Sequence, residues 1–247
     1  MSFTQDLRAS VLQAAMQGKL TEQLETDTPV SELLANIKVE KNRLISEKKI
    51  KKEKPLVAIS EDDIPFDIPE SWEYVRVGDI VSNRAGLSYN KENLIKKSDN
   101  MVRVLRGGNI FDGTYSFKPD DVMIDSSFVK SELFLNKNTI ITPAVTSLEH
   151  IGKMARIEKS FTDTVVGGFV LMLTPHLDDD ILSQYLLHVF LEPSFRDRCR
   201  NITNKSGQAF YNLSRQKLME LVIPIPPIEE QKRIVRRIEE IKRSFPR

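Results

Sequence analysis

Cysteine and histidine are scarce in this 247-residue sequence. Cys199 is the only cysteine, which excludes an internal disulfide framework and a zinc site built from several cysteines. The three histidines, His150, His176 and His188, lack the spacing of metal ligands. His188 lies in a helical stretch rich in Leu and Phe, which favours a hydrogen-bonded structural histidine over a metal ligand. We therefore expect no metal site in this chain.

Long hydrophobic runs are also absent. No stretch reaches the length of a transmembrane helix, and the amphipathic N-terminus lacks the uninterrupted apolar core of a signal peptide. A lone thiol fits a reducing compartment. We expect a cytoplasmic protein without a membrane partner.

An excess of one charge is missing, because the formal net charge is only +1. The charges are nevertheless segregated along the chain. Basic residues outnumber acidic ones by eight to three over residues 36–54, by six to one over 194–217 and by seven to four over 228–247. Such segments can form a phosphate-binding face, although solvated charge runs are commoner than binding sites.

Recognisable catalytic motifs are missing too. The segment 108–114 imitates a phosphate loop but lacks its lysine, so it predicts a turn. Asp120 and Glu132 hint at a nuclease carboxylate pair, but Phe134 stands where a lysine would complete the trio. There is no glycine-rich nucleotide turn and no Gly-x-Ser-x-Gly elbow. These absences favour a binding protein without its own cofactor over an enzyme.

Helical patterns occupy both ends of the sequence. A helix is predicted over residues 4–17, where Leu7 and Val11 share a face, and a second begins near residue 29 and ends in a lysine run. After two prolines, Ile234, Ile238 and Ile241 follow coiled-coil spacing. A helix this short needs a partner for its apolar stripe. That partner is the N-terminal helix, a second chain or the globular domain of the same chain, and spacing does not decide between them.

The middle of the chain mixes short strand-like runs, of which "WEYVRVGDIV" is the first, with one amphipathic helix, predicted over residues 179–200. This mixture predicts an α+β fold: one globular mixed α/β domain, flanked by helical segments that form a coiled-coil-like dimerisation or spacer element. The predicted divisions are an N-terminal helix at 1–20, a lysine-rich connecting segment and linker at 21–68, a globular domain at 69–222 and the start of a C-terminal helix at 223–247.

Two polar segments suit nucleic acid. Arg103 and Arg106 lie at the end of a strand-like run beside two glycines, where a guanidinium can read guanine or hold phosphate. The segment 201–214 is predicted as a polar loop, and Ser214 as the cap of a helix that begins with basic residues. Solvent-facing strand arginines and an ordinary polar loop are the alternative interpretations.

Several stretches of the sequence together resemble a known family. They are "LRASVLQAAMQGKL", "SELLANIKVEKNRLISEKKIKKEK", "IPFDIPESWEYVRVGDI", "VLRGGNI" and "NITNKSGQAFYNLSRQKLMELVIPIPPIEEQKRIVRRIEEI", in that order. In this order they resemble the specificity subunit of type I restriction-modification enzymes, in a half-subunit form with a single target-recognition domain. The resemblance spans nearly the whole chain, and "IPIPPIEEQKRIVRRIEE" is its most specific element.

The resemblance implies a non-catalytic subunit that binds double-stranded DNA. In that family a globular domain reads one half of a bipartite target, while the helices act as a spacer and dock the methyltransferase subunits. Adenine methylation and restriction belong to partner subunits, which would carry S-adenosylmethionine, ATP and Mg. A complete subunit has two recognition domains, so this chain is expected to be a half-subunit that forms a homodimer or a part of a longer chain.

The DNA contacts are predicted from loop-like position and side-chain chemistry. They are Arg103, Arg106, Asn109, Thr146, Ser147, Lys205, Ser206, Gln208 and Tyr211. Leu7, Val11, Ile234, Ile238 and Ile241 are predicted to form the helical interface. The alternative function is a helical adaptor that docks the methyltransferase without itself specifying DNA.

Overall fold

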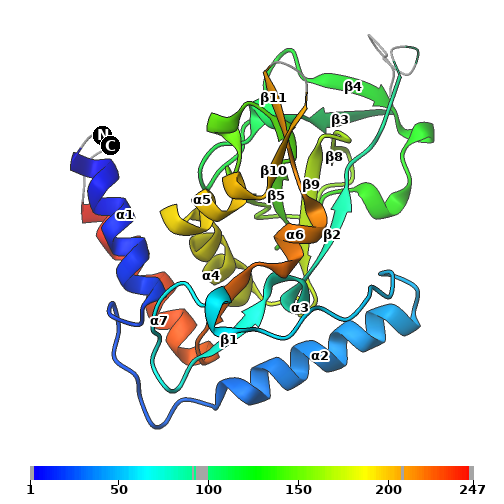
Figure 1. Ribbon diagram of the computed structural model, residues 1–247. Helices are drawn as coiled ribbons and strands as arrows, with labels where there is room; N and C mark the ends of the chain where they lie inside the picture. The colour runs from blue at the N-terminus through cyan, green and yellow to red at the C-terminus, as the bar shows by residue number, and fades with distance from the viewer. Residues whose placement is uncertain (1–2, 91, 93–99, 207–208, 245–247) are drawn as a thin grey trace. The chain divides into compact units, whose positions relative to one another are not determined.

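The computed structural model describes residues 3–90, 92, 100–206 and 209–244 (Figure 1). The chain divides into two compact units. The helical unit comprises Met1–Ser82, Pro175–Arg198 and Arg215–Arg247, and the strand unit comprises Asn83–Thr174 and Cys199–Ser214. The segment 69–222, predicted as one continuous domain, therefore contributes to both units.

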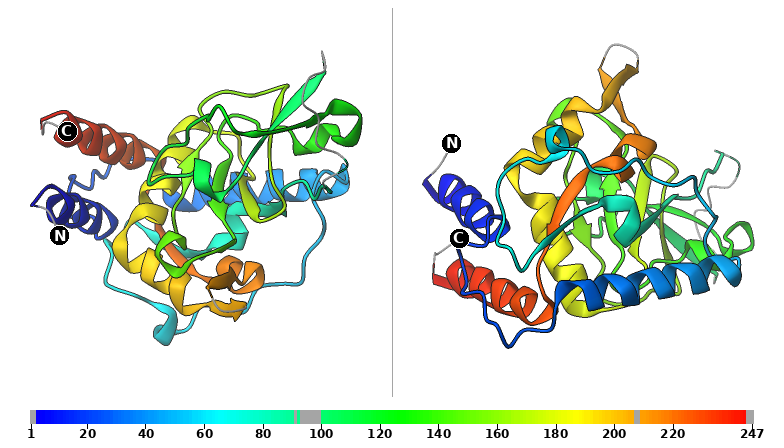
Figure 2. Two further views of the ribbon diagram at one scale, coloured as in Figure 1. Left: turned by 90° about the horizontal axis from the view of Figure 1, so that it is seen from above. Right: turned by 60° about the horizontal axis from the view of Figure 1, so that its bottom comes forward.

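The helical unit is built from helices and one two-stranded sheet. Its helices are α1 (Phe3–Met16), α2 (Val30–Ser46), α3 (Val77–Ile80), α4 (Asp180–Leu191), α6 (Arg215–Glu220) and α7 (Ile228–Ser244), with most of α5 (Pro193–Asn201) and the 3₁₀ turn η1 (Glu61–Asp63). Strand β1 (Glu73–Arg76) pairs antiparallel with β12 (Val222–Ile225). Helices α1 and α7 lie side by side in opposite directions, and both contact α4 (Figure 2).

Helix α4 forms the centre of this unit because it is apolar around most of its circumference. The carboxylate of Asp179 caps it by accepting a hydrogen bond from the Leu182 amide at 2.8 Å. Tyr185 and Leu186 are fully buried, and the Tyr185 hydroxyl donates to the carbonyl of Pro224 at 3.0 Å. The helix predicted over 179–200 is interrupted at Pro193, because proline lacks an N–H but suits the first turn of a new helix.

The described residues of the strand unit form three small sheets. Their strands are β2 (Val81–Ala85), β3 (Met101–Leu105), β4 (Val122–Asp125), β5 (Ile140–Pro143), β6 (Val145–Thr146), β7 (Ala155–Arg156), β8 (Thr164–Val166), β9 (Val170–Pro175), β10 (Thr203–Ser206) and β11 (Phe210–Leu213). The strand orders are β2-β9-β5-β7, β4-β3-β8 and β10-β11-β6, and β3 pairs parallel with β8. Four 3₁₀ turns, η3 (Gly107–Asn109), η4 (Ser126–Phe128), η5 (Ser131–Leu133) and η6 (Leu148–His150), connect them.

Apolar side chains from these sheets fill two clusters. One contains Leu105, Ile141 and Met172 with their neighbours, and the other surrounds Val104 and Ile124. Strand β3 contributes to both clusters, since alternate residues of a strand point to opposite faces. The ends of β3 are thereby fixed in position, which matters for the loop that follows it.

The mixed α+β class is confirmed, but two local predictions are wrong. The polar loop predicted over 201–214 is largely the β10–β11 hairpin, because its alternating residues pair with each other and with β6. The strand-like run "WEYVRVGDIV" is split into β1, α3 and β2. The predicted turn at 108–114 is confirmed, with Gly113 at a φ of 85°.

Two further findings concern the described residues. No helix among them is both long and apolar enough to cross a membrane. Within the same part of the chain, no group of three or more His, Cys, Asp or Glu side chains could hold a metal ion.

Candidate nucleic-acid interface

The β10–β11 hairpin presents a polar outer face. Asn204 pairs with Asn212 and Ser206 with Phe210, and partners across an antiparallel ladder point to the same face. All four of these residues are exposed, and the ring of Phe210 keeps 55% of its surface open to solvent. Two amides, a hydroxyl and an aromatic ring therefore share one solvent-facing surface.

The other hairpin face packs inward. Leu213 is buried on this face, and Tyr211, which pairs with the buried Thr146 of β6, is half-buried. Lys205 belongs to the same face but lies further along the hairpin and is exposed. Of the predicted contacts here, Ser206 and Lys205 are open to solvent, and Gln208 lies outside the described residues.

The loop after β3 combines cations with open backbone. Arg106 is exposed, and Gly107 and Gly108 follow it directly. A Cβ placed on Gly108 would have one near neighbour, the Nζ atom of Lys118 at 3.5 Å. The loop thus offers two cationic side chains beside backbone that a phosphate can approach closely.

Asn109 supports this loop from inside. Its side chain is 2% exposed, accepts a hydrogen bond from the Arg106 amide at 2.8 Å and donates to Asp121 Oδ1 at 2.6 Å. It also donates to the carbonyl of Ser116 at 3.0 Å. Every hydrogen-bonding atom of the amide is therefore engaged within the protein, and Asn109 positions Arg106 instead of presenting itself to a ligand.

Arg103 is engaged in a similar way. Its guanidinium donates to Asp121 Oδ2 at 2.9 Å and lies 4.9 Å from the centre of the Phe117 ring. Burial is the largest influence on the Asp121 carboxyl and opposes its ionisation, but hydrogen bonds from Lys118, Asn109 and Arg103 outweigh it and lower the pKa of Asp121. The ionised Asp121 thus holds both Arg103 and Asn109 in place.

A shallow hollow of about 380 Å³ adjoins Arg103. Its lining comprises Arg103, Phe117, Lys159, Ser160, Phe161, Thr162, Asp163 and Thr164. Phe117 and Phe161 meet edge to face at 5.8 Å, and the Lys159 ammonium lies 5.4 Å from the centre of the Phe161 ring.

Ser147 is the last of the predicted DNA contacts. It is half-buried, and its hydroxyl donates a hydrogen bond to the carboxylate of Glu149 at 3.4 Å.

The predicted helical interface lies within the helical unit. Ile234 and Ile238 on α7 are buried, Leu7 and Val11 on α1 are half-buried, and Ile241 near the end of α7 is also half-buried. Helices α1 and α7 are in contact. The apolar stripe of α7 therefore has partners inside the same chain, and Ile241 is its more accessible end.

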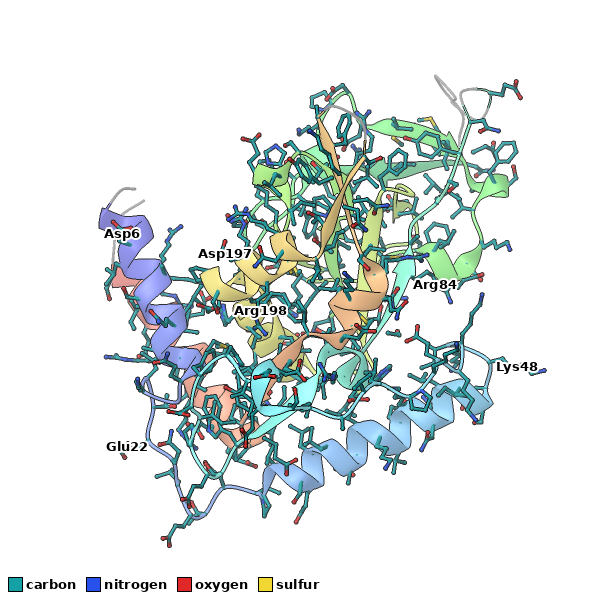
Figure 3. The ribbon with its side chains drawn as sticks, viewed as in Figure 1. Asp6, Glu22, Lys48, Arg84, Asp197 and Arg198 are labelled. Carbon is teal, nitrogen blue, oxygen red and sulfur yellow. The ribbon has the colours of Figure 1, made fainter. Side chains whose placement is uncertain are left out.

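A polar strap fixes the start of α7. The carboxylate of Glu230, with 0% exposure, accepts hydrogen bonds from Trp72 Nε1 at 2.8 Å, Gln23 Nε2 at 2.7 Å and Thr21 Oγ1 at 3.1 Å. Thr21 and Gln23 lie in the connection from α1 to α2, close in sequence to Glu22 (Figure 3). This connection therefore ties α1 to α7.

Arg233 extends the strap by one helical turn. Its guanidinium donates to Asp27 Oδ1 at 2.8 Å and to the carbonyl of Glu22 at 3.1 Å. The hydrogen bond from Arg233 lowers the pKa of Asp27, against the opposing effect of burial. We name the set Thr21, Gln23, Asp27, Trp72, Glu230 and Arg233 the strap.

With this geometry established, the sequence can be compared with known proteins. Residues 69–245 match the family of the type I restriction modification DNA specificity domain. The chain belongs to this family. The matched range includes the hairpin, the loop after β3 and α7, while α1 and α2 precede it.

The relatives are specificity subunits of type I restriction enzymes. The chain is 30% identical over 241 residues to the EcoAI specificity subunit and 27% identical over 236 residues to the EcoEI specificity subunit, both from Escherichia coli. Each match covers 95% of this chain but only 39% of the relative. The chain thus spans about two fifths of the length of these curated relatives.

The fold of the family is also shared. A structure solved for the complex assembly and conformational transition of the type I R-M system matches 98% of this chain and 51% of its own, with a TM-score of 0.53 and 17% sequence identity. At this identity the likeness shows a common fold alone.

The sequence missed the residues that the hairpin register reveals. Asn204 and Phe210 share the outer face with Ser206 and Asn212, yet neither of these two was predicted. The alternation of positions 204, 206, 210 and 212 was the available signal. It was hidden because the segment was interpreted as a loop, where side chains have no common face.

Proposed function

We propose that this chain is a non-catalytic DNA specificity component of a type I restriction-modification system. It reads one half of a bipartite duplex target and directs adenine methylation and restriction by partner subunits. The observation that carries the proposal is the family match over residues 69–245, which includes the exposed hairpin and the cationic loop. S-adenosylmethionine, ATP and Mg would be held by the partner subunits.

The hairpin supplies the chemistry for base recognition. Asparagine amides can pair with the N6 and N7 edge of adenine, and Asn204 and Asn212 lie opposite each other on the exposed face. A two-stranded ribbon also fits the major groove of B-DNA. We infer that the outer face of β10–β11 contacts base edges.

The loop after β3 and Lys205 supply the chemistry for phosphate. Arg106 and Lys118 flank the open backbone of Gly108. Phosphate contacts fix the register of a protein on DNA without carrying sequence information. We infer that Arg106, Lys118 and Lys205 position the duplex, whereas Arg103, Asn109 and Thr146 hold the protein surface in shape.

The helical unit supplies the assembly surface. The strap and the α1–α7 contact form a helical pair within one chain, and the half-buried Ile241 leaves apolar surface at its end. We infer that this end docks the methyltransferase subunits or a second copy of the chain. Ile241→Asp should then reduce capture of the methyltransferase subunit while the folded chain remains stable.

The test is to co-express the chain with its methyltransferase subunit in a host without adenine methylation and to map methylated adenines by sequencing. A specific motif that changes or disappears when Asn204 and Asn212 are both replaced by alanine supports the proposal. A palindromic bipartite motif indicates two paired copies, and an asymmetric motif indicates that another specificity chain supplies the second half.

The adaptor function predicts a different outcome. A soluble complex that assembles with the methyltransferase but produces no methylation motif would overturn DNA specification by this chain. Mobility of labelled duplexes at low and moderate salt gives an independent check, since an adaptor shows no sequence preference at either concentration.

A further inference from the structure

Phe169 is an exposed phenylalanine in the turn between β8 and β9. Its side chain keeps 71% of its surface open to solvent. A single exposed apolar side chain is ordinary on a protein surface. The backbone that carries Phe169 and the residues around it must therefore indicate whether the ring binds a ligand.

The backbone beneath the ring is fixed from two sides. The Phe169 carbonyl accepts hydrogen bonds from the amides of Ala144 at 2.8 Å and Val145 at 3.3 Å. On the other side, the Gly167 amide donates to the carbonyl of Leu105 at 2.8 Å. A ring on a fixed backbone loses little further conformational freedom when it binds a ligand.

A third segment packs closely against the same turn. A Cβ on Gly86 would lie 2.2 Å from the Val166 carbonyl oxygen, so only glycine allows this approach. On the turn itself, a Cβ on Gly168 would lie 2.9 Å from Ser88 Oγ. The chain thus packs tightly around the backbone of the turn while the ring of Phe169 stays open to solvent.

Backbone hydrogen bonds connect the turn of Phe169 to both parts of the candidate interface. Val145, whose amide donates to Phe169, also pairs with Asn212 of the hairpin. Leu105, whose carbonyl accepts from Gly167, directly precedes Arg106. The backbone of the Phe169 turn is therefore bonded to the strand that pairs with Asn212 and to the residue that precedes the exposed Arg106.

This surrounding favours nucleic acid over a protein partner. The exposed neighbours Ser88, Arg106 and Asn212 are polar or cationic, whereas an aromatic anchor of a protein interface lies in a well-packed, desolvated pocket. A protein can contact the phosphates and sugars of DNA, the base edges in the grooves and, where a base step is unstacked, the base faces. Arg106 suits the phosphates, Asn212 the base edges and Phe169 the base faces.

We propose that Phe169 is a stacking residue that inserts its ring against the bases of the duplex target. The inference rests on the proposed function and adds a specific contact to it, between an aromatic ring and the face of a base. A phenyl ring contacts the face of any base, so it carries no direct sequence code. It instead favours steps that unstack at low cost, such as pyrimidine–purine steps, and contributes indirect readout.

The experiment uses the full chain with its methyltransferase subunit and a duplex that carries the mapped target. 2-Aminopurine replaces one base at a time, and its fluorescence rises where stacking is disrupted. With the native chain, one step that lies away from the methylated adenine should show this rise, because the methyltransferase itself takes its target base out of the stack. Phe169→Ala should abolish it and weaken binding to the target by about tenfold, the effect of losing one stacked base.

Two variants and one control sharpen the result. Phe169→Trp retains an aromatic face and should keep the fluorescence rise, whereas Phe169→Ser retains neither a ring nor an apolar side chain and should lose it. Phe128→Ala is the matched control, because Phe128 is 53% exposed and follows Asp125, which pairs with Met101 at the opposite end of β3. This control should behave as the native chain.

The outcomes separate the inference from the proposed function. A native complex without preference for the target over a permuted duplex would overturn the proposed function and the stacking with it. A native preference that Phe169→Ala leaves unchanged would overturn the stacking alone. If Phe169→Ala binds the target normally but loses the methyltransferase subunit, the ring contacts protein and the inference is wrong.

Discussion

The strap and the hairpin use the same kinds of side chains for opposite purposes. In the strap, the carboxylate of Glu230 is buried and its hydrogen bonds are satisfied by Trp72, Gln23 and Thr21. In the hairpin, the amides of Asn204 and Asn212 are exposed. Polar groups that pair with each other stabilise a fold, while polar groups left at the surface are available to a ligand.

The two regions also differ in how their positions are established. The strap joins segments far apart in sequence, since residues 21–27 contact residues 230–233. The hairpin joins neighbours in sequence, with Thr203 paired to Leu213. A long-range polar network therefore fixes the architecture of the helical unit, and a local ladder presents side chains from the strand unit.

Loss of the Glu230 carboxylate should have the largest effect. Glu230→Ala leaves the buried Trp72 N–H without its acceptor and removes the hydrogen bonds to the half-buried Thr21 and the exposed Gln23. We expect a loss of about 4 kcal/mol in the free energy of unfolding. Chemical denaturation measures it. Glu230→Gln, which retains one acceptor oxygen, should lose less, and the exposed Glu240→Ala should change little. If Glu230→Ala and Glu240→Ala lowered the free energy of unfolding equally, the buried carboxylate would contribute no more to stability than an exposed one.

The apolar seam of α7 should come next. Ile238 has 1% exposure, and Ile238→Ala should lower the free energy of unfolding by about 3 kcal/mol through lost burial and the cavity left behind. Ile241→Ala, one helical turn further along and half-exposed, should cost less than half as much. Denaturant titration of both variants checks this. A similar cost at the two positions would mean that the end of α7 is as well packed as its middle.

Asn212 on the hairpin should change binding and leave stability unaltered. We expect Asn212→Ala to reduce discrimination at one base position by about 1–3 kcal/mol and to shift the free energy of unfolding by less than about 0.5 kcal/mol. Competition binding with singly substituted duplexes measures the first quantity. Asn136→Ala, an exposed loop asparagine of the same unit, is the control. A loss of stability at Asn212 would place it with the strap residues instead.

The smallest effect should be present at neutral pH and disappear in acid. The backbone hydrogen bond from Ser60, followed by the contact with Arg76, lowers the pKa of Asp63 to about 2. A carboxyl with a depressed pKa stabilises the fold above its ordinary pKa of 3.8, and this contribution disappears as pH falls towards about 2. Asp63→Asn should thus be less stable than the native chain at neutral pH, with the difference closing between these values. Acid titrations followed by circular dichroism test whether the difference closes in this pH range, with the variant Asp62→Asn at an exposed position as the control.

Periodicity in the sequence predicted the helices well. The helix expected over residues 4–17 is α1, Phe3–Met16, and the isoleucine spacing of α7 correctly marked its buried face at Ile234 and Ile238. These features are local, because the 3.6-residue repeat and the proline before α7 act within a few turns of chain. The family could likewise be identified from a few short stretches of the sequence.

Contacts between distant residues could not be predicted in the same way. Asn109 looked like an exposed loop residue, yet its amide is buried against Asp121, and Arg103 is engaged with the same carboxylate. The outer face of the hairpin was hidden because pairing register, and not residue type, decides which side chains share a surface.

The sequence by itself determined the family, the α+β class and the helical segments, because composition, spacing and periodicity are properties of neighbouring residues. Only the tertiary structure decided which polar groups are consumed by the fold and which remain exposed. Burial and hydrogen-bond pairing depend on segments up to 209 residues apart, as between Thr21 and Glu230. The polar groups of the strap are therefore paired inside the protein, whereas the outer face of the hairpin and the ring of Phe169 remain exposed.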